Sequence, residues 1–139
     1  MKYLLDTCVI SELIKKEKNS KVVKWIKKRK ESSLFISVLT VGEIQKGISK
    51  LPDSHKKEYL KTWIDNDLKK RFSGRILEIT EEIATSWGEI QAKSESEGKK
   101  MPAIDSLIAA TAIKNNLTVV TRNEKDIENS GCKSINPWE

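Results

Sequence analysis

The chain has 139 residues, which suits one domain with one hydrophobic core, and we expect residues 1–139 to form a single domain. Hydrophobic residues make up 37% of the sequence, and no apolar run approaches the roughly 20 residues of a spanning helix, which argues against a membrane protein. The formal net charge is +6, which favours polyanionic partners. Since the first residues also lack the features of a signal peptide, we expect a cytoplasmic protein.

Short β-like runs alternate with helical patterns along the chain, as they do in α/β proteins. Strands are expected at residues 2–5, 34–36, 75–79, 118–121 and 133–135. Helices are expected to begin near Thr7, Val22, Val38, Asp53, Glu81 and Pro102. The polar residues 94–100 are expected to form a loop. Because strands separated by helices need crossover connections, the sequence predicts a mainly parallel sheet inside a three-layer α/β/α domain.

The helix expected after Pro102 has an unusually apolar pattern. Its apolar residues are Ile104, Leu107, Ile108, Ala109, Ala110, Ala112 and Ile113. A helix with so little polar surface is buried on nearly all sides, so we expect it at the centre of the domain.

Much of the excess positive charge lies in residues 21–30, here named the basic segment. Its basic residues are Lys21, Lys24, Lys27, Lys28, Arg29 and Lys30. Binding of RNA phosphates and a solvated helix face explain these residues equally well, and both interpretations stay open.

Acidic residues stand next to several of the expected strand and helix ends. Asp6 follows the first strand directly, and Glu43 and Asp126 come shortly after two later strands. Asp105 lies near the start of the apolar helix, on a face of small apolar residues. Because the carboxyl ends of parallel strands meet at one edge of a sheet, where ligands bind, we expect these carboxylates to collect there.

Each acid also has an ordinary structural explanation. Asp6 is suited to cap the first helix, and Thr40 with Glu43 matches a capping box. Asp105 is placed to interact with a helix dipole, and Asp126 has the character of a surface acid. Jointly these explanations are less convincing, because several carboxylates in one concavity repel one another unless a cation is present.

The kinds of ligand available restrict the kind of metal. The chain has one histidine, His55, and two cysteines far apart, which argues against a zinc site and excludes a histidine-pair ribonuclease mechanism. Hard oxygen ligands select Mg²⁺ or Mn²⁺. Such a site activates water and holds a phosphodiester for in-line attack.

These motifs, in this order and spacing, resemble the PIN-domain family, and within it the VapC-type toxin ribonucleases. The resemblance runs over essentially the whole chain. It consists of LLDTCVISE at 4–12, SVLTVGEI at 37–44, DSLIAATA at 105–112, VVTRN at 119–123 and INPW at 135–138. The last of these is similar to the subgroup that includes FitB.

The resemblance implies a PIN fold and an endoribonuclease that depends on Mg²⁺ or Mn²⁺. The family's acids, which are catalytic and bind the metal, map to Asp6, Glu43, Asp105 and Asp126. Glu124 is a second candidate for the fourth acid. The polar positions that line the same pocket are matched by Thr7, Thr121 and Asn123.

The resemblance also implies partners, and the sequence departs from the family at one position. It implies a homodimer, an RNA substrate and a cognate antitoxin of the VapB type or similar, through which DNA is contacted only indirectly. Cys8 stands where the family often has Asn, so we expect weaker support of Asp6 by its neighbours.

Two other functions stay under consideration. One is a FitB-like nucleic-acid-binding subunit of a DNA-binding complex, with weak or no nuclease activity. The other is a receiver domain, which also gathers acids at a sheet edge but pairs them after its first strand and needs a lysine after a late strand. Here Thr7 and Cys8 follow Asp6, and Arg122 follows Thr121, which argues against a receiver domain.

Overall fold

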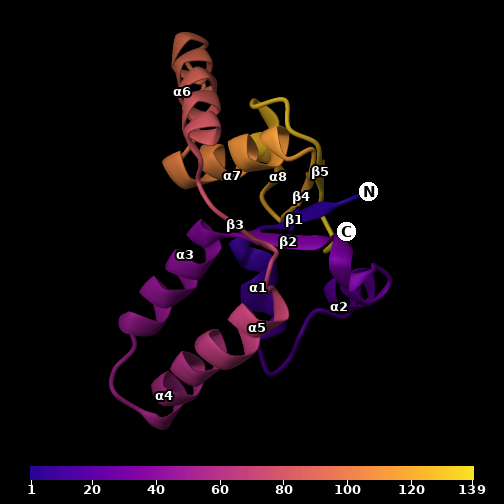
Figure 1. The fold of residues 1–139 in the computed structure, drawn as a ribbon, viewed down its shortest axis with the longest axis vertical. Helices are drawn as coiled ribbons and strands as arrows, with labels where there is room; N and C mark the ends of the chain where they lie inside the picture. Colours follow the sequence, from indigo (N-terminus) through magenta and orange to yellow (C-terminus); the bar gives the residue numbers. More distant parts are fainter.

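A sheet of five parallel strands forms the middle layer of the protein (Figure 1). The computed structural model describes all residues 1–139. The strands are β1 (Tyr3–Leu5), β2 (Leu34–Ser37), β3 (Ile76–Leu77), β4 (Thr118–Val120) and β5 (Ser134–Ile135). They lie in the order β3-β2-β1-β4-β5, and every neighbouring pair is parallel. The mainly parallel sheet expected from the sequence is therefore confirmed.

Helical segments lie on both sides of this sheet (Figure 1). Before β3 they are α1 (Thr7–Leu13), α2 (Ser20–Lys27), η1 (Glu31–Ser33), α3 (Val38–Ser49), α4 (His55–Thr62), η2 (Trp63–Leu68) and α5 (Lys69–Arg71). After β3 they are α6 (Glu81–Ser96), α7 (Ala103–Lys114) and α8 (Glu124–Glu128). None of these helices has the length and apolar character needed to cross a membrane.

Side chains of the central strand alternate between two separate cores. Leu4 is fully buried against residues of α6 and α7, among them Ile108. Tyr3 and Leu5 point to the other face, where they join residues of α1, α2, α3 and η2 and the buried Phe72. One core on each face of the sheet confirms the three-layer α/β/α arrangement.

Helix α7 is the buried helix that the sequence predicts. Ile108, Ala109, Ala110 and Ala112 have at most 1% of their surface exposed. The small alanine side chains allow the sheet and α6 to approach closely, so α7 is held firmly between them. Its first turn, which carries Asp105, therefore has a fixed position at the edge of the sheet.

Some boundaries differ from those expected. The loop expected at residues 94–100 is wrong in its first part, because α6 continues to Ser96 and buries Ser94. The capping box of Thr40 and Glu43 is also wrong. Ser37 caps α3 instead, with its hydroxyl accepting from the backbone N–H of Leu39, and Thr40 lies inside the helix. Residues 63–68 form a π-helical turn rather than regular α-helix.

The strand order reverses between β1 and β4, and this reversal brings together two segments that lie far apart in the sequence. Leu5 of β1 pairs with Val120 of β4. The residues that follow, Asp6 and Thr121, therefore leave the sheet side by side. A crevice at such a reversal is where open α/β sheets bind their ligands.

Candidate active site

Asp6 lies where β1 ends and α1 begins. Its backbone N–H donates to the carbonyl of Val120 at 3.0 Å, so the sheet fixes its position. Its Oδ1 accepts from the backbone N–H of Thr7 at 2.8 Å, and its Oδ2 accepts from the hydroxyl of Thr121 at 2.8 Å. Asp6 is thus a helix cap, as its structural explanation predicts. It is also fixed by Thr121, which directly follows β4.

Cys8 supports the same carboxylate from the first turn of α1. Its Sγ lies 3.8 Å from Oδ2 of Asp6 and 3.6 Å from the hydroxyl of Thr121. Burial, and then the charge of Asp6, raise the pKa of the Cys8 thiol, so its hydrogen stays available to the carboxylate. Since a thiol is a weak donor, the stronger support of Asp6 comes from Thr121 and Thr7.

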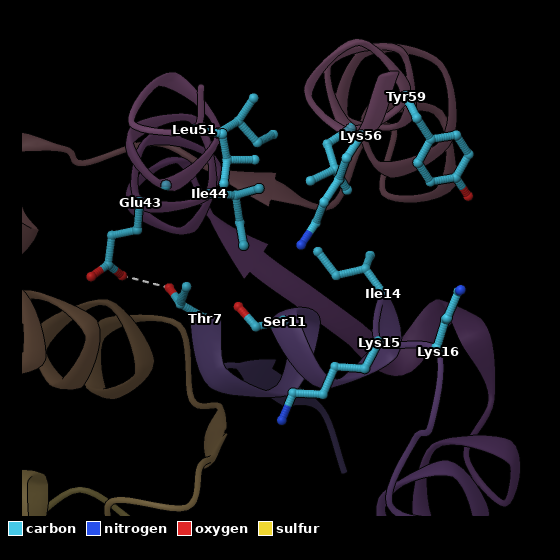
Figure 2. Close-up of a pocket in the computed structure, with 13 residues that line it drawn as sticks. Thr7, Ser11, Ile14, Lys15, Lys16, Glu43, Ile44, Leu51, Lys56 and Tyr59 are labelled. Carbon is cyan, nitrogen blue, oxygen red and sulfur yellow. Dashed lines mark hydrogen bonds between the residues drawn. The ribbon is translucent and has the colours of Figure 1, made fainter. Parts of the chain in front are cut away.

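Glu43 extends from α3 toward the start of α1. Its carboxylate accepts from the hydroxyl of Thr7 at 2.5 Å (Figure 2). The hydroxyl of Thr7 also lies 3.2 Å from that of Thr40, which is fully buried one turn before Glu43. Thr40 is not among the site residues predicted from the sequence, although its spacing of three from Glu43 puts both on one helix face.

Asp105 shows that the acids share one region. Burial, and then the charges of Asp6, Asp126 and Glu43, raise the pKa of Asp105 to about 6. No hydrogen bond and no ion pair compensates its charge. The four acids proposed from the sequence are therefore electrostatically coupled around Asp105.

The candidates for the fourth acid are placed differently. Asp126 is exposed on α8, and its charge acts on Asp105. Glu124 instead accepts a hydrogen bond of 2.6 Å from the hydroxyl of Ser134. Asn123 donates its backbone N–H to the hydroxyl of Thr121 at 3.0 Å, which helps to hold the loop after β4. Of these two acids, only Asp126 contributes to the raised pKa of Asp105.

This set of donors fits a divalent cation of the oxygen-preferring kind. The donors are carboxylates without histidine, and Asp105 has no basic neighbour to neutralise it. No three of these groups lie close enough to enclose an ion directly. Mg²⁺ is commonly bound by one or two carboxylates and keeps several waters, so direct enclosure by three is not a requirement.

The basic segment lies away from the acids. Its last residues, 27–30, lead through η1 into the start of β2, whereas the acids lie at the carboxyl ends of the strands. The guanidinium of Arg29 stacks on the rings of Trp25 and Tyr3, at 4.2 and 5.5 Å from their centroids. Binding of RNA by this segment stays a prediction.

A groove of about 840 Å³ opens next to Thr7 and Glu43, between α1, α3 and α4 (Figure 2). Its apolar lining consists of Ile14, Ile44, Ile48, Leu51, Tyr59 and Leu60. Lys15, Lys16 and Lys56 line it as well. The sequence did not reveal this groove, because its lining comes from three helices that only the tertiary fold brings together.

Comparisons of this chain with a family model and with known proteins agree on one family. The PIN domain model matches residues 3–129, which include all four acids. The plasmid stability protein StbB of Pseudomonas syringae pv. tomato is 35% identical and aligns over 98% of each chain. Toxin FitB of Neisseria gonorrhoeae is 34% identical over 97% of each chain. The VapC ribonuclease Y4jK of Sinorhizobium fredii is 32% identical over 98% of this chain and 97% of its own.

A solved structure agrees with these relatives. A chain in the crystal structure of FitAcB from Neisseria gonorrhoeae superposes with a TM-score of 0.94 at 34% identity, and the match covers 99% of both chains. The likeness therefore extends over the sheet, both helical layers and the edge that carries the acids. The chain belongs to the PIN-domain family, in its VapC-type branch.

Proposed function

We propose that the protein is the endoribonuclease toxin of a type II toxin–antitoxin pair and that it hydrolyses RNA phosphodiester bonds with Mg²⁺ or Mn²⁺. The observation that carries this proposal is the coupling of Asp6, Glu43 and Asp126 to Asp105 at the carboxyl edge of the sheet. The names of two relatives, a toxin and a VapC ribonuclease, support it. PIN-domain nucleases as a class use divalent metal ions, which agrees with the donors present.

The residues of the site have distinct roles in this proposal. Asp6 and Asp105 hold the ion, while Glu43 and Asp126 complete its surroundings or orient water. When bound, the ion would stabilise charge on the phosphate and make water a stronger nucleophile. Thr121 keeps Asp6 in place, and Thr7 keeps Glu43 in place, through hydrogen bonds from neutral hydroxyl groups.

The partners follow from the same assignment. We assign a cognate antitoxin, of the VapB type or similar, to the groove beside Glu43, since its apolar lining and its lysines suit an amphipathic acidic segment. An occupant there would contact Glu43 and Thr7, at one side of the acidic site. We also propose a homodimer that acts in the cytoplasm and contacts DNA only through the antitoxin.

A second function has an observation of its own. A chain from the structure of FitAB bound to an IR36 DNA fragment superposes with a TM-score of 0.93 at 33% identity, covering 99% of this chain and 96% of that one. The chain would then serve mainly as a subunit of a DNA-binding complex, with weak or no nuclease activity. RNA cleavage by the purified protein distinguishes the two functions.

The first prediction concerns stability without metal. Since Asp105 has a higher pKa in the folded protein (about 6) than its ordinary 3.8, the folded state binds more protons between these values. Folding stability should therefore fall as the pH rises from about 4 to about 6, and it should stay lower above that range. Asp105→Asn should remove this loss, so in chelator the variant should melt higher than wild type at pH 7.5.

Thermal melts from pH 4 to 8, with chelator and then with Mn²⁺, test this expectation. Mn²⁺ should raise the melting temperature of wild type in a concentration-dependent way and that of Asp105→Asn much less. Asp53→Asn is the matched control, because Asp53 is fully exposed in the turn between α3 and α4 and pairs only with Lys57. If the melting temperatures of wild type and Asp105→Asn in chelator change with pH in the same way, the acids do not repel one another as described.

The second prediction concerns catalysis. Purified protein should cleave total RNA with Mg²⁺ or Mn²⁺, and chelator should abolish the cleavage. Asp6→Asn and Asp105→Asn should each lower kcat/KM by at least about 100-fold, because each removes several kcal/mol of charge stabilisation. Asp53→Asn should cleave like wild type. Cleavage that persists in chelator would refute the metal mechanism, and no cleavage of any RNA would favour the DNA-binding subunit.

The third prediction concerns growth. Induced expression of the chain alone should arrest bacterial growth, and Asp105→Ala at equal protein level should not. Co-expression of the small protein encoded next to it should restore growth if that protein is the antitoxin. Arrest by both the wild type and Asp105→Ala would mean that toxicity does not arise from hydrolysis.

A further inference from the structure

A polar hollow of about 490 Å³ lies beside Asp126, between the turn that joins α6 to α7 and helix α8. Lys99 and Lys100 line it from the turn, and Lys125, Asp126 and Glu128 line it from α8. Met101 and Pro102 are its only apolar lining residues, whereas apolar side chains make up much of the lining of the groove beside Glu43. It shares Asp126 with the acidic site, so whatever occupies it lies next to the acids.

The backbone holds this hollow in shape. Helix α6 ends with Gly98 in the left-handed region, at φ 69°, and the N–H of Lys99 donates back to the carbonyl of Ser94 at 2.8 Å. On the opposite wall, the amide of Asn129 donates to the hydroxyl of Ser94 at 3.3 Å. The turn with its lysines and the end of α8 are therefore tied to the same buried residue.

The lysines of the hollow have no acidic partner within the protein. None of Lys99, Lys100 and Lys125 forms an ion pair, whereas several other lysines, such as Lys15 and Lys69, do. Three ammonium groups face two carboxylates in the hollow, and one of the two, Asp126, belongs to the acidic cluster. The lining of the hollow thus has an excess of one positive charge, and the hollow adjoins the acidic site through Asp126.

We propose that this hollow binds the phosphates of the RNA strand next to the bond that is cut, an inference that rests on the proposed function. Ammonium groups bind phosphates as point charges and position a strand without reading its sequence. Lys99, Lys100 and Lys125 would guide the strand past Asp126 toward Asp105. The lysines of the basic segment precede the start of β2, at the opposite ends of the strands from the acids, so we expect them to contribute less to binding these phosphates.

Two charge-matched variants test this assignment. The hollow variant is Lys99→Gln/Lys100→Gln/Lys125→Gln, and the comparison variant is Lys27→Gln/Lys28→Gln/Lys30→Gln. Each removes three positive charges. Both are made in the Asp105→Asn background, and their binding to a fluorescent single-stranded 12-nucleotide RNA is measured with Mg²⁺ at several salt concentrations.

The hollow variant should bind the RNA at least about tenfold more weakly at 0.15 M salt. Its plot of log affinity against log salt should be flatter by about 2, since each lost phosphate contact removes about 0.7 from the slope. The comparison variant should lose less than about threefold. A Lys→Arg triple variant of the hollow, which keeps the charge, should bind like the parent. Equal losses in the hollow and comparison variants, or weaker binding with an unchanged slope, would overturn the proposal.

Catalysis and folding are measured separately, with Asp105 intact. The hollow variant should raise KM for the same RNA at least about tenfold with kcat nearly unchanged, because the lysines bind substrate and do not react. Its melting temperature should match that of the parent, since the three side chains are exposed. If the wild type cleaves no RNA while the binding results are as expected, the hydrolase assignment fails and the RNA site stands.

Discussion

Repulsion among four carboxylates is the constraint that the rest of this structure accommodates. Burial first, and then this repulsion, raise the pKa of Asp105. The protein opposes it with two buried cores, one on each face of the sheet, which hold β1, β4 and α7 in place. The donors that orient Asp6 and Glu43 are neutral hydroxyl and amide groups. They fix the geometry without cancelling the negative charge that a cation needs.

Glu12 shows how the same chain treats an acid that has only a structural role. It is 4% exposed and accepts from the backbone N–H of Asn19 at 3.0 Å and from Lys15 at 3.0 Å. Those hydrogen bonds, with Arg122 nearby, lower the pKa of Glu12. A buried acid with basic partners and a lowered pKa stabilises the fold, whereas Asp105, with neither, leaves its charge available. The opposite pKa shifts of Glu12 and Asp105 therefore distinguish a structural acid from a candidate ligand of a cation in the same molecule.

The sequence predicts those features that depend on local patterns or on chain order. The apolar run after Pro102 gave the central helix, and an acid directly after the first strand gave Asp6 a place at the sheet edge. Features that depend on packing between distant segments were not predictable. Thr40 meets Thr7 only because α3 crosses the start of α1, and the stacking of Arg29 on Tyr3 needs α2 against β1. Ser94 reads as polar and loop-forming, yet its burial under α8 extends α6.

The pairing of β1 with β4 also has a consequence for synthesis of the protein on the ribosome. Asp6 is made well before the residue that holds it, because the hydroxyl that donates to its carboxylate belongs to Thr121, 115 positions later. Until β4 leaves the exit tunnel, β1 lacks one of its two neighbours and Asp105 has no assembled edge to face. A nascent chain therefore carries every acid up to Asp105 and still cannot form the site. Translation itself delays the appearance of the complete acidic cluster until β4 and Asp126 have left the exit tunnel.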